Sequence, residues 1–389
     1  MSRPIDRKDA IAHAAAKLFA ERGFAAVGMD DLGAAVGITG PAIYRHFAGK
    51  DAVLESVVLD LLDEFVRQAD AVEAVTPGAG ARDSALDRLV TTSVAVALSH
   101  PSQVATYVRE RGRLTGAAAG QAAVQERHLR AIWERLLRLD VPSLPSELVT
   151  VRQQAVLAAT GAMTAQRGRV TRPRLGQLLV DGSLRMMRMP PAAPTTGLAQ
   201  VAEPEWLPQV SRRETILNAA LTLFRAKGYH GVGMDEIGEA AGISGPAIYR
   251  HYVSKADILL DAYDRVGSRV AVGVEVALEG ASSPLDALRR LISSYVTIAS
   301  DNVNLIMATR EEGAALPKAE RPRLLRQQRD IAERWARIVA ELRPDLSESE
   351  VRSHVGCVFP MVNHVVQLPA RVLDRGPELE ALAEAFLLA

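Results

Sequence analysis

Apolar residues recur along most of this chain with the spacing of an α-helix. Near the start, Ile11, Ala15, Leu18 and Phe19 stand at i, i+4, i+7 and i+8, which form one helix face, and Gly23 follows as a stop signal. No segment shows the clear apolar–polar alternation of a half-buried strand. The pattern predicts an all-α fold, with further helices near 51–74, 82–99, 101–119, 121–139, 146–167, 171–188, 256–279, 284–300, 302–315, 320–342, 347–368 and 376–388.

The chain contains an internal repeat. Leu18–Phe47 and Leu223–Tyr252 align without gaps at an offset of 205, and 18 of the 30 positions are identical, a similarity that chance does not produce. Beyond this block the two copies remain weakly similar as far as Trp133, which corresponds to Trp335 in the second copy. Between the copies, residues 189–210 are rich in Pro, Ala and Thr and lack apolar periodicity, as expected for a linker. The sequence therefore predicts two units of one architecture in tandem.

Each copy carries the pattern of a helix-turn-helix motif. A short helix is predicted over 29–36, with Gly28 at its N-cap and Gly37 at its end. Thr39 then caps a third helix, and Pro41 lies in its first turn, where a missing N–H has no cost. The second copy repeats these two residues as Ser244 and Pro246. Helix, glycine-bearing turn and helix together are typical of DNA-binding modules.

The third helix separates a core face from an outer face. At 100° per residue, Ile43 and Phe47 point to the core and Arg45 points away from it. An outer arginine can bind a guanine edge with two hydrogen bonds, while Tyr44, His46 and Lys50 suit phosphate oxygens. Each residue alone is explained equally well as solvated surface or helix-end packing. Because the exposed set recurs unchanged, we predict DNA contacts from Thr39, Gly40, Ala42, Tyr44, Arg45, His46, Lys50, Ser244, Gly245, Ala247, Tyr249, Arg250, His251 and Lys255.

Composition adds constraints of a different kind. The 389 residues carry 46 basic and 46 acidic side chains, so DNA contact must come from local placement of charge rather than from a bulk field. The single cysteine, Cys357, excludes an internal disulfide and fits a reducing compartment. The polar first ten residues do not resemble a signal peptide, and no apolar run is long enough to span a membrane. We expect a cytoplasmic protein without a membrane partner.

At the motif residues the chain resembles the TetR family of bacterial regulators. The family pattern, Ile-Ala-x-x-Ala-Gly-Val-Ser-x-x-x-Leu-Tyr-x-His-Phe-x-x-Lys, appears as LGAAVGITGPAIYRHFAGK over 32–50 and as IGEAAGISGPAIYRHYVSK over 237–255. The resemblance implies that each unit is a three-helix DNA-binding domain followed by a helical bundle with a small-molecule pocket and a dimer face. The expected domains are 1–50, 51–188, the linker 189–210, 211–255 and 256–389.

The chain departs from the family pattern in two respects. Gly28 and Gly233 stand where the family usually has a threonine that caps the helix and touches phosphate; glycine can cap a helix, but that contact is lost. The family also has one unit per chain and works as a homodimer. Here one chain is expected to form an intramolecular pseudo-dimer; the rival arrangement is a dimer of tandem chains with four DNA-binding modules.

Candidate effector-binding residues are polar or aromatic side chains on the middle helices. They are Tyr107, Arg109, Trp133, Tyr295, Arg310 and Trp335. The aromatics are explained at least as well by ordinary core packing, and the arginines by ion pairs with the neighbouring glutamates. The Arg-Glu stretch followed by a basic helix is similar to TetR relatives that answer to acyl-CoA or steroid-CoA esters, which implies an acyl-CoA or other lipid-like effector. No cofactor is expected.

One C-terminal helix carries residue types that bind metals. His354, Cys357 and His364 share a helix face by their spacing and are ligand types that zinc or copper accepts. The first copy has no counterpart, however, and Pro360 is expected to interrupt the helix. A buried cysteine and two hydrogen-bonded histidines are the favoured interpretation, so no metal is predicted.

The sequence bears on three classes of function. An enzyme is disfavoured because the sequence has no glycine-rich phosphate loop, no nucleophile elbow and no repeated carboxylate cluster. A ligand-binding or scaffolding protein that no longer binds DNA is supported only by the zero net charge. The two intact recognition helices favour a ligand-responsive DNA-binding transcriptional regulator, which in this family is most often a repressor acting on a pseudo-palindromic operator.

Overall fold

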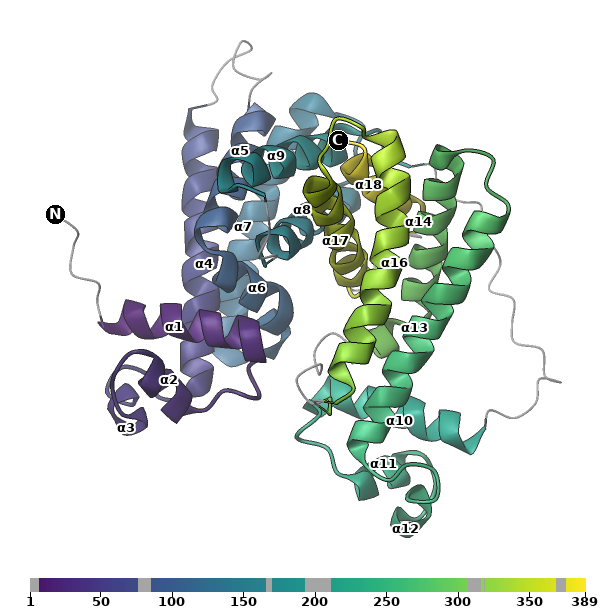
Figure 1. Cartoon of the computed structure of the whole chain (residues 1–389). Helices are drawn as coiled ribbons and strands as arrows, with labels where there is room; N and C mark the ends of the chain where they lie inside the picture. Colours follow the sequence, from purple (N-terminus) through teal and green to yellow (C-terminus); the bar gives the residue numbers. More distant parts are fainter. Residues whose placement is uncertain are drawn as a thin grey trace. The chain divides into compact units, whose positions relative to one another are not determined.

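A computed structural model describes residues 7–75, 85–165, 170–192, 211–306, 316–317, 319–368 and 376–389. Within these residues every regular element is a helix (Figure 1). No helix in this part of the chain is long and apolar enough to cross a bilayer. The chain divides into two compact units: unit 1 comprises Met1–Pro191, Ser349–Val365 and Ala385–Ala389, and unit 2 comprises Ala192–Glu348 and Val366–Glu384. The domain boundaries expected from the sequence stay a prediction.

Unit 1 contains the first repeat and the helix α17. Its helices are α1 (Arg7–Arg22), α2 (Met29–Ala35), α3 (Gly40–Ile43), α4 (Lys50–Ala74), α5 (Ala85–Ser99), α6 (Pro101–Glu110), the 3-10 helix η2 (Arg111–Arg113), α7 (Gly116–Asp140), α8 (Ser146–Ala165), α9 (Arg172–Arg188) and α17 (Glu348–Val365). The first three form the helix-turn-helix module, and the long α4 continues from it into the bundle (Figure 1).

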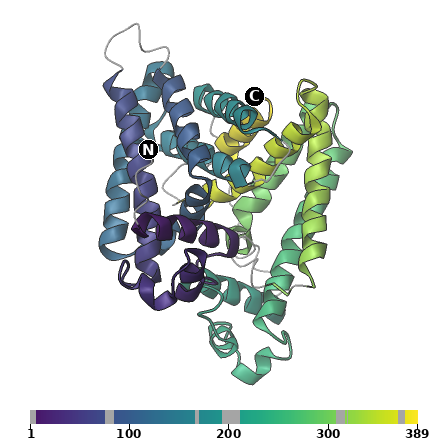
Figure 2. The ribbon, with the colours of Figure 1, turned by 60° about the vertical axis from the view of Figure 1, so that its left-hand side comes forward.

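Unit 2 contains most of the second repeat. Its helices are α10 (Arg212–Lys227), α11 (Met234–Ala240), α12 (Gly245–Ile248), α13 (Lys255–Glu279), α14 (Pro284–Asp301), α16 (Arg321–Leu342) and the larger part of α18 (Gly376–Leu387). The green α13 and yellow-green α16 run side by side in both views (Figures 1 and 2). The all-α prediction is therefore confirmed, and most helices begin and end within a few residues of the predicted limits.

One predicted helix, over 101–119, is wrong. The chain turns after α6 and η2 and starts a new helix, α7, at Gly116. Leu114 has extended backbone angles, and Gly116 has a φ of +55°, in the left-handed region that favours glycine. Apolar periodicity on both sides of such a corner looks continuous in the sequence, because the corner itself is only a few residues long. The predicted helix over 302–315 lies largely outside the described residues.

The first helix-turn-helix module is fixed within unit 1 through α1 and the loop that follows it. Thr106 on α6 donates from its hydroxyl to the Ala16 carbonyl at 3.0 Å. The Phe24 backbone N–H donates to the Glu110 carboxylate at 3.1 Å, and Glu110 is only 3% exposed. Arg113 also donates to Glu110, at 2.6 Å, so the buried carboxylate has a compensating charge. The end of α6 thus holds the helix-turn-helix module in place.

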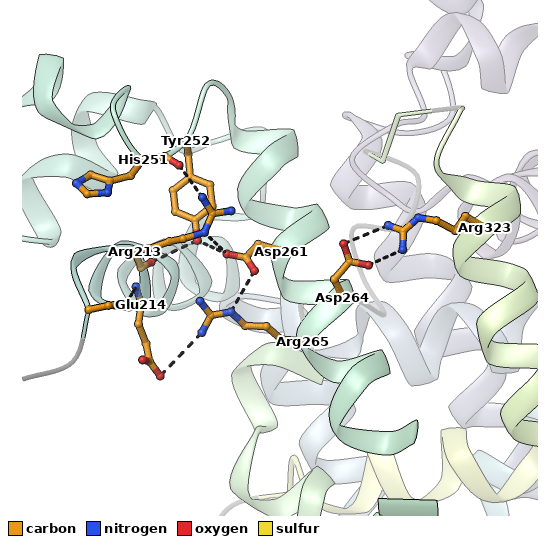
Figure 3. A network of polar contacts seen from close by, with 9 residues as sticks. Arg213, Glu214, His251, Tyr252, Asp261, Asp264, Arg265 and Arg323 are labelled. Carbon is orange, nitrogen blue, oxygen red and sulfur yellow. Dashed lines mark hydrogen bonds and ion pairs between the residues drawn. The ribbon is translucent and has the colours of Figure 1, made fainter. Parts of the chain in front are cut away.

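The second module is fixed by a different polar network on α13 (Figure 3). Arg213 of α10 donates to Asp261 at 2.9 Å and to the His251 carbonyl at 2.9 Å. The Tyr252 hydroxyl also donates to Asp261, and the Arg213 guanidinium lies 4.2 Å from the centre of the Tyr252 ring. Arg265 donates to the second carboxylate oxygen of Asp261 at 3.1 Å. Asp261 therefore joins α10, the end of the recognition segment and α13.

The charge state of this network follows from its contacts. Burial disfavours ionisation of Asp261, but hydrogen bonds from Tyr252 and Arg265 and the charge of Arg265 outweigh it, so the pKa of Asp261 lies below its usual value. Burial and the bond to Asp261 raise the pKa of Tyr252, which stays a donor. At pH values above the ordinary pKa of an aspartate, the network contributes its full stability to the folded state. This contribution is lost as the pH falls through the lowered pKa of Asp261.

Loss of the Tyr252 hydroxyl provides the first test. The substitution Tyr252→Phe should lower the free energy of unfolding by about 1.5–3 kcal/mol, because the hydroxyl bonds a partly buried charged group. The reverse change, Phe47→Tyr, should bring no matching gain, since the first repeat has Ser56 where the second has Asp261. Urea denaturation at neutral pH measures both effects, and equal stability of the Tyr252 variant and the original protein would contradict the assignment.

Candidate nucleic-acid interface and effector cavity

The helix-turn-helix geometry depends on a very close approach between α2 and the turn before α3. A Cβ atom at Gly33 would lie 2.7 Å from the Ile38 carbonyl oxygen and 2.8 Å from the Gly40 nitrogen. A Cβ at Gly40 would overlap the Asp30 carboxylate. Gly37, which ends α2, has a φ of +71°. Glycine is required at these points by contact distance and by backbone angle, so the turn has one geometry.

The recognition segments present the faces that the periodicity predicts. Regular helix covers only four residues in each copy, and turns continue to Phe47 and Tyr252. Ile43 and Ile248 are fully buried. On the opposite side the two tyrosines are exposed, Tyr44 to 56% and Tyr249 to 52%. Exposure of a large aromatic ring to water is unfavourable. The recurrence of exposed tyrosines at equivalent sites of the two repeats therefore indicates a contact surface.

The predicted base-reading arginines stand beside these tyrosines. Arg45 and Arg250 are exposed, and in the described part of the chain neither side chain has an ion pair or hydrogen bond within the protein. His46 is exposed, His251 is half-buried, and both Ala42 and Ala247 are half-buried beside the outer face. We call Tyr44, Arg45 and His46, with Tyr249, Arg250 and His251, the reading surfaces. Their guanidiniums are free to meet a ligand outside the protein.

The caps of the motif differ in part from expectation. Gly28 is the N-cap of α2 as predicted, and its backbone N–H donates to the Asp31 carboxylate at 2.8 Å. Thr39 and Ser244 occupy the N-cap positions of α3 and α12, but neither side chain makes a capping hydrogen bond, so the expected side-chain caps are wrong. Both hydroxyls are exposed instead. Gly40 is buried, so any contact it makes to DNA goes through its backbone.

Lys50 and Lys255 lie within the fold rather than pointing freely outward. The Lys50 ammonium donates to the Phe24 carbonyl at 2.9 Å and lies 4.4 Å from the centre of the Phe24 ring. Lys255 donates to the Tyr229 carbonyl at 2.7 Å and stacks on the Tyr229 ring. Burial is the main reason that the pKa of Lys50 lies below its usual value. Each lysine therefore fastens the loop after the first helix, and a phosphate contact from either stays a prediction.

A cavity of about 60 Å³ lies in the bundle of unit 1, with room for several water molecules. Its walls come from α4, α5, α6, α7 and α8 and are mostly apolar. The predicted residues Tyr107 and Trp133 both line it, together with Leu61, Leu62, Phe65, Ser93, Val94, Ala97, Glu126, Leu129, Gln153, Gln154, Val156, Leu157 and Thr160. Concave apolar space with a few polar groups is typical of a small-molecule site.

The polar end of the cavity is a linked set of side chains. Tyr107 donates to Glu126 at 2.9 Å, and Arg111 donates to both carboxylate oxygens of Glu126 at 2.6 and 3.0 Å. Burial, followed by the charge of Glu126, raises the pKa of Tyr107. His364 of α17 bonds Gln154 at 2.9 Å, and Gln154 also lines the cavity. The Glu126 charge is thus compensated before any ligand enters.

The other predicted effector residues lie elsewhere. Arg109 does not line this cavity; it donates to the carbonyls of Phe19 and Ala20 on α1, at 3.4 and 3.3 Å. Tyr295 and Trp335 are buried against each other in the second repeat, and Arg310 falls outside the described residues. Sequence reasoning missed Glu126, although it stands two helical turns before Trp133 and so shares its face.

The three residues with metal-binding side chains on α17 each have another partner. His354 bonds the Glu350 carbonyl at 3.0 Å, and Cys357 donates to the Ser353 carbonyl at 3.0 Å. His364 bonds Gln154. The expectation that Pro360 interrupts the helix is wrong, since α17 continues through it to Val365. A proline inside a helix removes one backbone hydrogen bond, and the fully buried residues around it, Cys357, Val358, Met361 and Val362, supply the packing that offsets the loss.

The reading surfaces coincide with two matches to one family model. The model described as "Bacterial regulatory proteins, tetR family" matches residues 11–57 and 216–262. Each match covers the helix-turn-helix module and the beginning of the long helix that follows it.

Similar proteins extend these matches. The chain is 36% identical over 89 residues to the "HTH-type transcriptional activator FasR" of Mycolicibacterium smegmatis, covering 23% of this chain and 41% of FasR. It is 36% identical over 105 residues to the "HTH-type transcriptional repressor KstR2" of Rhodococcus jostii, covering 27% of this chain and 50% of KstR2. These matches therefore span half or less of either relative. The solved structure of KstR2 from Mycobacterium tuberculosis aligns with a TM-score of 0.40 at 20% identity, over 48% of this chain and 95% of that one.

The exposed arginines give the second test. Arg45→Ala and Arg250→Ala should each weaken binding to a duplex selected in vitro by the original protein by about 1–3 kcal/mol, and each should relax base preference in one half of the site. The exposed Arg130 on α7 provides the control, because Arg130→Ala removes the same charge away from the reading surfaces. Fluorescence anisotropy titrations at fixed salt measure the affinities. Unchanged affinity in both variants would show that these arginines do not read bases.

Proposed function

Because the chain consists of two tetR-family units in tandem, we propose that it is a DNA-binding transcriptional regulator that reads a pseudo-palindromic operator with both units of one chain. The observation that carries this proposal is the recurrence of the same exposed Tyr-Arg-His set on both recognition segments. Core packing does not determine which side chains stand at exposed positions. Two similar half-sites of one operator, in contrast, require the same base-contacting residues on both recognition segments. Repression is the direction of regulation proposed, and the site of action is the cytoplasm.

Pairing of the two repeats within one chain is supported by the composition of unit 1. That compact unit includes residues 349–365 and 385–389 of the second repeat. Inside it, a Cβ at Gly182 of α9 would lie 2.7 Å from the Phe386 ring, so glycine permits this contact. Arg174 of α9 pairs with Glu350, and Arg185 donates to the Leu388 carbonyl. The last helices of the two repeats thus share one core, as the dimer face of a two-unit regulator would.

The linker permits this pairing. Residues 189–210 number 22 and reach at most about 70–80 Å when fully extended. Such a tether keeps the two repeats at an effective concentration in the millimolar range, which favours pairing within a chain over pairing between chains. At the start of this segment the buried Arg152 donates to the carbonyls of Met187 and Met189 at 2.8 and 2.7 Å. The first residues after α9 are therefore held.

An effector is proposed to bind the cavity of unit 1 and weaken DNA binding. The cavity reaches α6, and α6 carries Thr106, Arg109 and Glu110, which bond α1 and the loop after it. A ligand that displaces Tyr107 therefore acts on the helix that holds the first DNA-binding module. A ligand shifts the equilibrium only by its differential affinity for the two states.

The lining supports an apolar ligand, or an apolar ligand portion, without a negative charge. Glu126 is the charged residue among those that line the cavity, and Arg109, the expected anchor for an acidic group, bonds α1 instead. An acyl-CoA effector rests on the family resemblance; one solved neighbour, AibR, was crystallised in complex with isovaleryl coenzyme A and operator DNA. For this chain the cavity suits an acyl chain and not a phosphate-bearing headgroup.

The stoichiometry on DNA provides the third test. Light scattering of the purified protein on the selected duplex should give one chain per duplex, with a free-protein mass of one chain. A duplex with one half-site scrambled should bind much more weakly, because the second unit then makes only non-specific contacts. Two chains per duplex and a doubled free mass would overturn the intramolecular pair. Failure to enrich any duplex from a random library would instead favour a ligand-binding protein without DNA recognition.

A further inference from the structure

The two repeats can be aligned beyond their DNA-binding modules. Ala85–Ser99, which is α5, matches residues 287–301 of α14 without gaps at an offset of 202. The same offset pairs Trp133 with Trp335 and Pro142 with Pro344. The cavity-lining positions of the first repeat therefore have defined counterparts in the second.

The serine that borders the cavity has a tyrosine as its counterpart. Ser93 lines the cavity of unit 1, and the aligned residue is Tyr295. Tyr295 is 7% exposed, and its ring lies edge-on to Trp335, with the ring centres 6.3 Å apart and the planes at 85°. Edge-to-face contact at this distance is favourable for two aromatic rings. Beside the equivalent tryptophan, a phenol ring thus stands where the first repeat has a hydroxymethyl group next to open space.

Most of the polar side chains that line the cavity are also replaced in the second repeat. The counterparts of Glu126, Gln153, Gln154 and Thr160 are Gln328, Val355, Gly356 and Val362. In addition, α8 belongs to the same compact unit as α5 and α7, whereas its counterpart α17 belongs to unit 1 rather than to the unit that holds α14 and α16. In the second repeat an amide therefore replaces the carboxylate, apolar residues or glycine replace the other three polar side chains, and the corresponding helix belongs to the other compact unit.

From these replacements we propose that the chain binds one effector, in the first repeat, and that Tyr295 closes the equivalent site of the second repeat. This inference rests on the proposed effector role of the unit 1 cavity. Ser93 keeps that cavity open, and its neighbours select an uncharged, largely apolar small molecule. One site per chain gives a ligand-binding curve without cooperativity, whereas two equivalent sites in a homodimer can be coupled.

Exchange of the two aligned residues tests the proposal. The uncharged dye N-phenyl-1-naphthylamine serves as probe, titrated into the full chain without DNA, so that the result does not depend on operator binding. The original protein should bind one dye per chain. Ser93→Tyr should reduce binding at least tenfold, and Tyr295→Ser should add a second equivalent. Tyr295→Phe, which keeps the ring, is the matched control and should leave one site.

Energy transfer from tryptophan to the dye locates the bound probe. Trp133→Phe should remove the larger part of the transfer, and Trp335→Phe should leave it nearly intact. This comparison decides the question if Tyr295→Ser proves unfolded by circular dichroism. Two dyes on the original chain, binding retained in a folded Ser93→Tyr variant, or no binding at all would each overturn the single-site assignment, while the DNA titrations of the arginine variants would stand or fall separately.

Discussion

Each recognition segment has only four residues of regular helix, and a helix this short is not stable by itself in water. Its position depends on burial of one side chain, Ile43 or Ile248, and on contact with the preceding turn. Gly33 makes this contact possible, because any side chain there would collide with backbone atoms of the turn. Presentation of Tyr44 and Arg45 to solvent is therefore a consequence of packing on the opposite face. The reading surface is as rigid as the small core beneath it.

The two repeats keep this geometry and differ in how it is supported. In the first, a buried carboxylate at the end of α6 holds the loop after α1. In the second, a carboxylate on α13 joins Arg213, Tyr252 and Arg265. Under the proposed function, DNA recognition constrains the exposed face, whereas different sets of contacts can hold the opposite face. The exposed Tyr-Arg-His set is identical in the two repeats although the polar contacts that hold the modules differ, and this indicates that the exposed set is functional.

The sequence was sufficient for the fold but only partly for the site. Helical periodicity and the repeat located most helices, because both signals extend over many residues. The corner at Gly116 was not predicted, because it occupies only a few residues between two helices of similar apolar pattern. Tyr107 and Trp133 were found as aromatics on middle helices, but the distinction between Arg109 and Arg111 requires side-chain direction. One of these neighbours bonds α1 and the other bonds Glu126, and no local pattern separates those outcomes.

If the two reading surfaces bind one DNA duplex together, a single effector molecule is sufficient to dissociate both of them from the DNA. Binding of the second unit is then an intramolecular step whose strength depends on the effective concentration set by the first. Loosening of the first module by movement of α6 removes its contribution and the advantage that it gives to the second. The remaining single module binds at the level of one half-site. Under the proposed function a tandem chain needs only one responsive cavity. The second repeat is then free to fill its counterpart with Tyr295, and the stability that this buried ring contributes would be retained in both states of the proposed regulator.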